Sequence, residues 1–203
     1  IRQREAIVEE IQEHFYDQRP EDEQVAVEVL QAIDDVYVAE NAEFGEGLIE
    51  EYFEQTLLQT EYSVNDLLIL YLYFLSNALS FKRNDDVLKK VRNNIVTIID
   101  CSDNTYMHLL QRVLIAIVLY QLRNEYYEDI SVIFNFLREI MMEIQDSNLK
   151  PTVDYFEAKY YLYGEKDKEK ALQCYEKAIN GAEFSHDMNF KNRVIEEKNK
   201  DFP

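Results

Sequence analysis

The sequence predicts an all-α protein, a right-handed superhelical solenoid of antiparallel helix pairs with degenerate tetratricopeptide-like repeats and a C-terminal capping helix. The composition is the first reason, because only four Gly and three Pro occur in 203 residues and leave little turn chemistry for a sheet protein. The second reason is a pair of helices predicted over 151–186. The third is that the packing row of this pair recurs along the chain at intervals near forty residues.

The helix pair over 151–186 carries the clearest repeat pattern. Its second helix places Ala171, Tyr175 and Ala178 on one face, at the spacing of four and three residues that an α-helix requires. The small residues allow a neighbouring helix to approach closely, and the aromatic ring fills the space beside them. Such a row is typical of the second helix of a tetratricopeptide repeat, although the turn over 164–168 is longer than usual.

The same row recurs three times upstream. The four rows begin at positions 48, 87, 130 and 171, which are 39, 43 and 41 residues apart. The upstream rows are Leu48, Tyr52 and Gln55; Val87, Val91 and Asn94; and Ile130, Phe134 and Leu137. This spacing favours a stack of helix pairs. The alternative is an ordinary closed bundle, since helices of about twenty residues would also show some periodicity.

The other helices follow from apolar periodicity and from residues that begin helices. Ser63 with Asp66 three residues later resembles a capping box. Asp103 or Asn104 caps another helix, and Pro151 stands where a first-turn proline belongs. The last helix is polar and unpaired, as expected of a cap on a stack. Besides the pair over 151–186, we expect helices over 4–17, 22–40, 48–60, 64–81, 86–100, 104–122, 128–145 and 187–200.

The charge of the chain is strongly negative and unevenly distributed. The formal net charge is −19, which argues against the chain itself binding a phosphate backbone. Residues 9–54 hold sixteen acidic residues and one basic residue, Arg19. The ordinary interpretation is a solvated outer face. The alternative is a docking surface for a basic partner or a basic neighbouring domain.

No pattern typical of an enzyme, a metal site or a cofactor site occurs. The only metal-like spacing, Glu183 to His186, occurs once and in a turn, whereas a di-iron bundle needs it twice. Nucleotide-binding glycine motifs, the nucleophile elbow and the zinc-protease motif are absent. We therefore expect no enzymatic activity, no metal and no cofactor.

The cellular location is inferred from the cysteines and the apolar runs. Cys101 and Cys174 lie far apart and form no paired motif, which fits a reducing cytoplasm. No apolar run approaches the roughly 18 residues that span a bilayer, and there is no signal peptide. We therefore expect a cytoplasmic protein with no membrane partner.

The predicted solenoid has a concave wall formed by the first helices of successive pairs. The wall would be an apolar trough with a few polar anchors, which suits an extended apolar peptide. Arg112 must find an anion or reach water, and candidate anions are a peptide's C-terminal carboxylate or a neighbouring glutamate. For Leu72, Ile115 and Leu119 the alternative is an ordinary place in the core. The expected lining residues are Tyr37, Leu72, Ser76, Asn77, Ser80, His108, Arg112, Ile115, Leu119, Phe156, Tyr160 and Tyr163.

Four segments carry a resemblance to a known family: the helix start over 62–68, residues 150–153 followed by 158–160, residues 170–179, and the N-terminal segment 1–17. In these segments the chain resembles the peptide-binding repeat domain of Gram-positive quorum-sensing transcription regulators, the group that includes PlcR, Rgg and ComR. ComR is the nearest of these. One departure concerns Arg112, which stands where an asparagine is expected, so the peptide specificity would differ.

The resemblance implies that residues 1–203 are a single sensing domain, which binds a short re-imported pheromone peptide in its concave groove. It also implies an upstream helix-turn-helix domain, absent from this sequence, and a homodimer that binds DNA only through that domain. The competing class is a scaffold or adaptor repeat protein, which would bind a segment of a partner protein and sense nothing.

Overall fold

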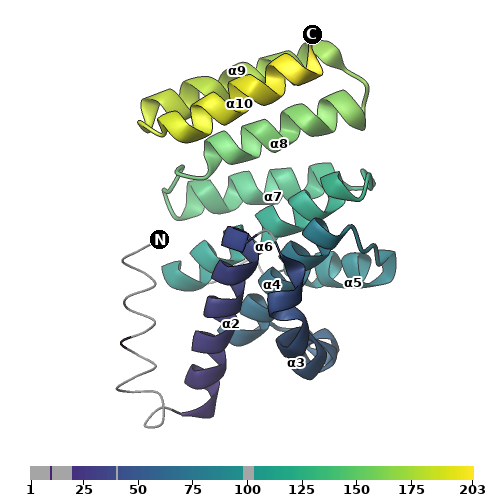
Figure 1. The fold of residues 1–203 in the computed structure, drawn as a ribbon, viewed down its shortest axis with the longest axis vertical. Helices are drawn as coiled ribbons and strands as arrows, with labels where there is room; N and C mark the ends of the chain where they lie inside the picture. Colours follow the sequence, from purple (N-terminus) through teal and green to yellow (C-terminus); the bar gives the residue numbers. More distant parts are fainter. Residues whose placement is uncertain (1–9, 11–19, 40, 98–102) are drawn as a thin grey trace. The chain divides into compact units, whose positions relative to one another are not determined.

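The computed structural model of the protein describes residues 10, 20–39, 41–97 and 103–203 (Figure 1). Secondary structure in this part of the chain is helical, and no strand occurs there. The all-α prediction is therefore confirmed. The chain divides into two compact units, Ile1–Asp100 and Cys101–Pro203. The handedness of a superhelix and the single sensing domain stay predictions.

The first unit is built around an apolar helix, α4. Its described elements are α2 (Glu21–Ala39), the 3₁₀ turn η2 (Ala42–Gly45), α3 (Glu46–Leu58), α4 (Val64–Ser80) and α5 (Asp85–Ile95). The predicted capping box begins α4, because the Ser63 hydroxyl accepts from the Asp66 backbone N–H at 3.2 Å while the Ser63 backbone N–H donates to the Asp66 carboxylate at 2.9 Å. Helices α2 and α3 and the turn η2 all pack against α4, which explains why α4 is apolar almost all round.

The second unit is a stack of helix pairs with a last helix on its end. Its elements are α6 (Asn104–Arg123), α7 (Ile130–Glu143), α8 (Lys150–Tyr163), α9 (Lys168–Phe184) and α10 (Met188–Asp201). Helix α6 packs on α7 and α8, α8 packs on α7 and α9, and α9 packs on α10. Carboxylates of Asp103, Asp167 and Asp187 accept backbone N–H groups at the starts of α6, α9 and α10.

The predicted packing rows are confirmed in the second unit. All three residues of the row on α9 are fully buried: Ala171, Tyr175 and Ala178. The row on α7 is buried in the same way, with Phe134 at its centre. Side chains of α8 and α10 complete this core through Ala158 and Val194. The Ala-aromatic-Ala pattern therefore identified the correct helix face.

In the first unit the predicted row on α3 was wrong by one residue. Phe53 and Thr56 are buried there, whereas the sequence had favoured the residues one position before each of them. The Phe53 ring stacks on the Tyr73 ring with 3.8 Å between centroids, and the Thr56 hydroxyl donates to Asp66 at 3.0 Å. These two contacts set the rotation of α3 about its axis.

The row on α5 was correct at its central residue, Val91, and wrong by one position at its two ends. Leu88, Val91 and Ile95 are buried, while the predicted Val87 and Asn94 are only half-buried. The Asn94 amide instead donates to the Gln59 carbonyl oxygen at 3.2 Å. A polar contact thus takes the place of the core contact that the row predicted.

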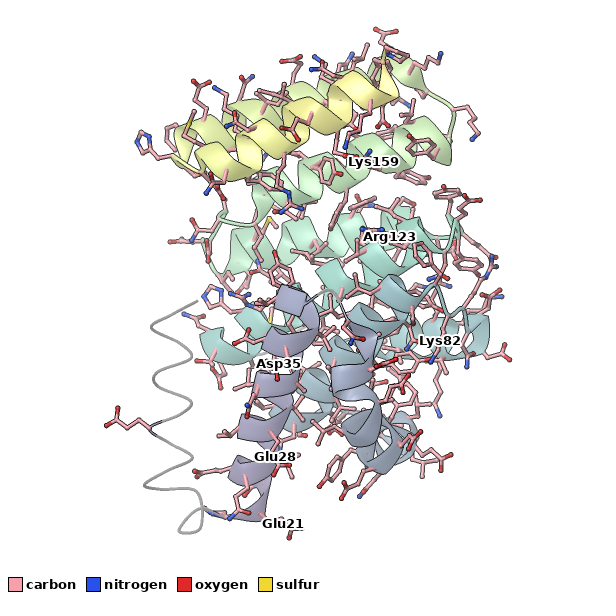
Figure 2. All side chains as sticks on the ribbon, in the orientation of Figure 1. Glu21, Glu28, Asp35, Lys82, Arg123 and Lys159 are labelled. Carbon is pink, nitrogen blue, oxygen red and sulfur yellow. The ribbon has the colours of Figure 1, made fainter. Side chains whose placement is uncertain are left out.

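The C-terminal helix α10 is held by a partly buried polar cluster around Lys159, the residue of α8 that is labelled in Figure 2. The Lys159 ammonium donates to Glu197 at 2.8 Å and to Asp201 at 3.0 Å. The hydroxyls of Tyr163 and Tyr175 also donate to Asp201. The predicted last helix is therefore confirmed, and these hydrogen bonds attach its polar sequence to α8 and α9.

Helix α2 carries acidic side chains one heptad apart. Glu21, Glu28 and Asp35 follow one another along the helix (Figure 2), and the first and last of these are exposed. This arrangement agrees with a solvated face, while the docking alternative stays a prediction.

Helix α6 is the one helix, within the described ranges, that is long and apolar enough to cross a membrane. The sequence analysis had expected no such segment. In the structure 56% of the most apolar window of α6 is buried inside the protein, as in the core helix of a folded unit. The predicted helix over 4–17, apart from the helical residue Glu10, and Cys101 lie outside the described residues.

Candidate functional site

An accessible stripe runs along α6, whose other faces are buried. His108 and Arg112 are exposed and Ile115 and Leu119 are half-buried, at intervals of four, three and four residues that place them on one helix face. The His108 imidazole Nδ1 lies 3.4 Å from an Asp146 carboxylate oxygen. Arg112 reaches solvent, which is one of the two outcomes expected for it. The structure thus brings four predicted site residues together on one face.

The three predicted residues of α8 have different neighbours. Phe156 is half-buried, with its ring centroid 5.5 Å from that of Tyr155. The Tyr160 ring lies 6.0 Å from the Phe134 ring of α7, and its hydroxyl donates to Glu165 at 2.5 Å. Burial and this carboxylate raise the pKa of Tyr160 to about 12. The Tyr163 hydroxyl donates instead to Asp201 of α10, so Tyr160 and Tyr163 have different hydrogen-bond partners.

A hollow of about 290 Å³ lies in the first unit between η2, α3 and α4. Three predicted residues of α4 line it: Ser76, Asn77 and Ser80. The Asn77 amide donates to the Tyr73 carbonyl oxygen at 2.8 Å, and the Ser80 hydroxyl donates to the Ser76 carbonyl oxygen at 2.9 Å. The Ser76 hydroxyl belongs to a residue only 4% exposed and has no hydrogen-bond partner. A buried polar group without a partner is uncommon and marks this wall of the hollow.

The remaining predicted residues of the first unit lie apart from this hollow. Leu72 is fully buried, and a Cβ added at Gly45 would lie 2.7 Å from its Cδ1 atom. The core alternative is therefore correct for Leu72. Tyr37 is 60% exposed near the end of α2.

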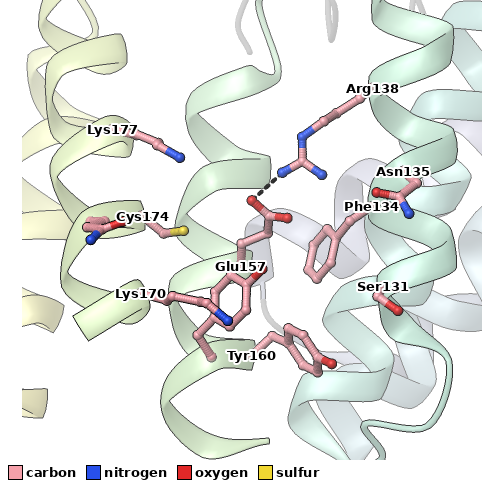
Figure 3. A pocket seen from close by; sticks show the side chains of 11 residues that line it. Ser131, Phe134, Asn135, Arg138, Glu157, Tyr160, Lys170, Cys174 and Lys177 are labelled. Atoms are coloured by element: carbon pink, nitrogen blue, oxygen red, sulfur yellow. Dashed lines mark ion pairs between the residues drawn. The ribbon is translucent and has the colours of Figure 1, made fainter. Parts of the chain in front are cut away.

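The sequence analysis missed a second cavity, of about 470 Å³, between α7, α8 and α9 (Figure 3). The Arg138 guanidinium and the Glu157 carboxylate point toward each other across it and form an ion pair. Lys170, Lys177 and Cys174 reach it from α9. Tyr160, a predicted site residue, also lines it. Arg138, Glu157 and Lys177 were not predicted, because the lining residues come from three helices at irregular spacing.

Two side chains that line this cavity have shifted pKa values. Burial raises the pKa of the Cys174 thiol to about 11, with a further contribution from Glu157. The pKa of Arg138 is raised, because its hydrogen bond and charge interaction with Glu157 outweigh the opposing effect of burial. A thiol with this pKa is a poor nucleophile. The residues described also contain no cluster of three or more His, Cys, Asp or Glu side chains that could hold a metal ion.

A family model described as ComR tetratricopeptide matches residues 1–198 of the chain. The chain belongs to this family. The comparison with curated proteins gave no match. The match includes the four segments that carried the resemblance and covers nearly the whole chain, and it confirms the family that the sequence analysis had identified.

Solved structures of ComR proteins are similar in fold. The competence regulator ComR from Streptococcus vestibularis, in complex with its cognate signalling peptide XIP, has a TM-score of 0.86 and 25% identity, over 98% of this chain and 68% of that chain. ComR from Streptococcus suis has a TM-score of 0.72 and 26% identity, over 100% of this chain and 66% of that one. ComR from S. thermophilus, in complex with DNA and its signalling peptide ComS, has a TM-score of 0.85 and 24% identity, over 97% and 67%. This chain thus spans about two thirds of the length of these ComR chains.

Proposed function

We propose that this chain is the sensor domain of a cytoplasmic quorum-sensing transcription regulator and that it binds a short hydrophobic signalling peptide. The observation that carries the proposal is membership of the ComR tetratricopeptide family. A ComR structure at 25% identity holds its cognate peptide. The accessible stripe on α6 supports the same function, because it offers apolar contact beside a cation.

The stripe on α6 provides the two kinds of contact that an apolar peptide needs. Ile115 and Leu119 are half-buried, and completing their burial contributes on the order of 1 kcal/mol each. Arg112 presents guanidinium N–H groups that suit the C-terminal carboxylate or a main-chain carbonyl oxygen of the peptide. His108 adds a polar group at the same face.

The hollow in the first unit is a separate candidate contact. Ser76, Asn77 and Ser80 supply polar atoms there, and the Ser76 hydroxyl lacks a partner within the protein. The Asn77 and Ser80 oxygens can accept hydrogen bonds from a ligand there, because their own donors are bonded to carbonyl oxygens of α4.

DNA recognition belongs, in this proposal, to a helix-turn-helix domain upstream of the sequence. The relatives are longer than this chain, and one of them was solved with DNA. The net charge of −19 does not suit direct contact with a phosphate backbone. Peptide binding would favour a homodimer that presents two DNA-binding domains. No enzymatic step is part of this function.

Calorimetry with a panel of short hydrophobic peptides tests the proposal. We expect at least one peptide to bind at micromolar or tighter affinity. Arg112→Ala should weaken this binding about tenfold, because a charge-assisted hydrogen bond is lost. Arg193→Ala, which removes an exposed arginine of α10, is the matched control and should bind as the parent does.

Absence of binding across the panel by the folded protein would refute the sensor function and favour a scaffold repeat protein. Tight binding that is indifferent to Arg112→Ala would keep the function and remove the α6 stripe as its site.

A further inference from the structure

The cavity between α7, α8 and α9 gathers basic side chains in a protein that is strongly acidic. The chain has a formal net charge of −19, whereas the described residues that line this cavity include three basic side chains and one acidic side chain. Arg138 reaches the cavity from α7, and Lys170 and Lys177 reach it from α9, so the cations come from opposite walls (Figure 3). Cations that converge on one cavity favour an anionic ligand.

Two of these cations already have a carboxylate partner. Glu157, the acidic lining residue, pairs with Arg138, and Asp167 pairs with Lys170 at 3.3 Å from outside the cavity. Lys177 is exposed and forms no ion pair with any residue that the structure describes. The three cations and two carboxylates leave a charge of +1, which a single carboxylate group of a ligand would neutralise.

Arg138 keeps donors for a ligand although it is paired. The Glu157 side chain is 9% exposed and that of Arg138 is 41% exposed, so the carboxylate is the buried end of the pair and the guanidinium is the accessible end. The ion pair uses the Nη2 nitrogen of Arg138, and a guanidinium has further N–H donors on its other nitrogens. Glu157 thus orients Arg138 and leaves N–H groups that suit a second carboxylate.

Aromatic rings lie beside these charges. The Tyr160 ring centroid lies 6.0 Å from that of Phe134 and 5.4 Å from that of Tyr161, and all three residues line the cavity. The Lys170 ammonium lies 5.3 Å from the Tyr161 centroid. The volume of about 470 Å³ is within the range of roughly 300–1,000 Å³ that small-molecule pockets have. This wall suits a ring attached to the anionic group.

We infer that the cavity between α7, α8 and α9 binds a small carboxylate ligand that carries an aromatic ring. The carboxylate would accept hydrogen bonds from Arg138 and Lys177, and the ring would pack against Tyr160 and Tyr161. The described lining residues include none from α6, so this site is separate from the stripe proposed for the peptide. The inference goes beyond the peptide-sensing function and does not depend on it.

The direct test is an NMR titration of the protein with phenylacetate and with phenylacetamide, its uncharged analogue of the same shape. For a ligand this small we expect phenylacetate to bind with a Kd on the order of 1 mM. It should shift backbone amide resonances over 131–138 and 170–177. Phenylacetamide should bind about tenfold more weakly, because its neutral amide group cannot form the charge-assisted hydrogen bonds.

Three variants place the anion within the cavity. Lys177→Met keeps the apolar stem of lysine and should weaken phenylacetate binding about threefold, since solvent screens part of the interaction. Lys168→Met removes the same charge from an exposed position of α9 outside the cavity, and should bind as the parent does. Arg138→Lys keeps a cation beside Glu157 but loses the planar guanidinium, and should also weaken binding about threefold.

Several results would overturn the inference. Equal binding of phenylacetate and phenylacetamide would show that the cavity does not select an anion, and equal losses in Lys177→Met and Lys168→Met would place the anion outside it. Shifts of the same size with acetate would exclude a role for the aromatic ring. Tighter binding of phenyl phosphate would make the ligand a phosphate ester and the carboxylate assignment wrong. If phenylacetate shifts no resonance of the folded protein while peptides of the panel bind, this inference fails and the peptide-sensing proposal stands.

Discussion

Replacement of Lys159 by Met tests the account of how α10 is attached to the second unit. The Lys159 side chain is 15% exposed and that of Asp201 is 5% exposed, with 3.0 Å between their charged atoms. Its hydrogen bonds with Glu197 and Asp201 outweigh desolvation, so the pKa of Lys159 is raised. The Met side chain keeps the apolar stem of lysine and removes the charge.

The expected cost is about 3 kcal/mol of unfolding free energy. Removing one partner of a buried ion pair costs about 3–5 kcal/mol, since the other charge stays buried. Asp201 keeps the hydroxyls of Tyr163 and Tyr175 as donors, which places the cost at the lower end of this range. Adding Asp201→Asn should restore about 2 kcal/mol, because the uncompensated carboxylate is then absent.

The assay is urea denaturation followed by circular dichroism. Lys170→Met is the matched control, because Lys170 also pairs with an aspartate, Asp167 at 3.3 Å, and lies 5.3 Å from the centre of a tyrosine ring. The Lys170 side chain is 59% exposed, so solvent screens its ion pair and its loss should change the unfolding free energy very little. If Lys159→Met costs no more than Lys170→Met, the reasoning about burial is refuted.

Three further predictions concern pH, packing and reactivity. Hydrogen bonds from two lysines lower the pKa of Glu197 from 4.5 to about 2. The stabilising contribution of this carboxylate is therefore present above pH 4.5 and is lost as the pH falls toward 2. Glu197→Gln should lower the unfolding free energy by about 1 kcal/mol at neutral pH, after allowance for solvent screening, and by almost nothing near pH 2. Gly45→Ala should lower the unfolding free energy by about 1–3 kcal/mol, because its methyl carbon would lie 2.7 Å from a buried leucine carbon. Gly47→Ala, whose methyl carbon would have nothing within 4 Å, should stabilise α3 by about 0.5–1 kcal/mol. Equal denaturation midpoints of the two variants would contradict this prediction. In the Cys101→Ser background, which removes the other thiol, the reactivity of Cys174 can be measured alone. Because its pKa is about 11, the thiol should react with a disulfide reagent about 100-fold more slowly in the native than in the unfolded chain. Equal rates would contradict its burial.

The sequence predicted the packing row of α9 better than that of α3, and the reason is the pattern of small residues. Ala171 and Ala178 leave room for a neighbouring helix on one face only, so the row that contains them has one possible orientation. The row on α3 has no small residue. Its orientation depends on the stacking of Phe53 against Tyr73 and on a hydrogen bond to Asp66, which are long-range contacts that periodicity does not reveal.

The candidate site was predictable where it follows one helix. His108, Arg112, Ile115 and Leu119 share a face by spacing alone, and the structure leaves that face accessible. Leu72 could not be assigned to the core or to the groove from the sequence, because α4 is apolar almost all round and its pattern does not indicate which leucine is buried. The cavity at Arg138 and Glu157 could not be predicted as a cavity for a different reason, because its lining residues come together only when three helices pack.

Methyl NMR of the protein saturated with its tightest-binding peptide is the most direct test of the central claim. The account predicts intermolecular nuclear Overhauser contacts between the peptide and the methyl groups of Ile115 and Leu119. It predicts none to Ile130 and Leu137, which are fully buried in α7 and serve as internal controls. Contacts confined to the cavity between α7, α8 and α9, or a saturating peptide that touches no methyl group of α6, would contradict the account.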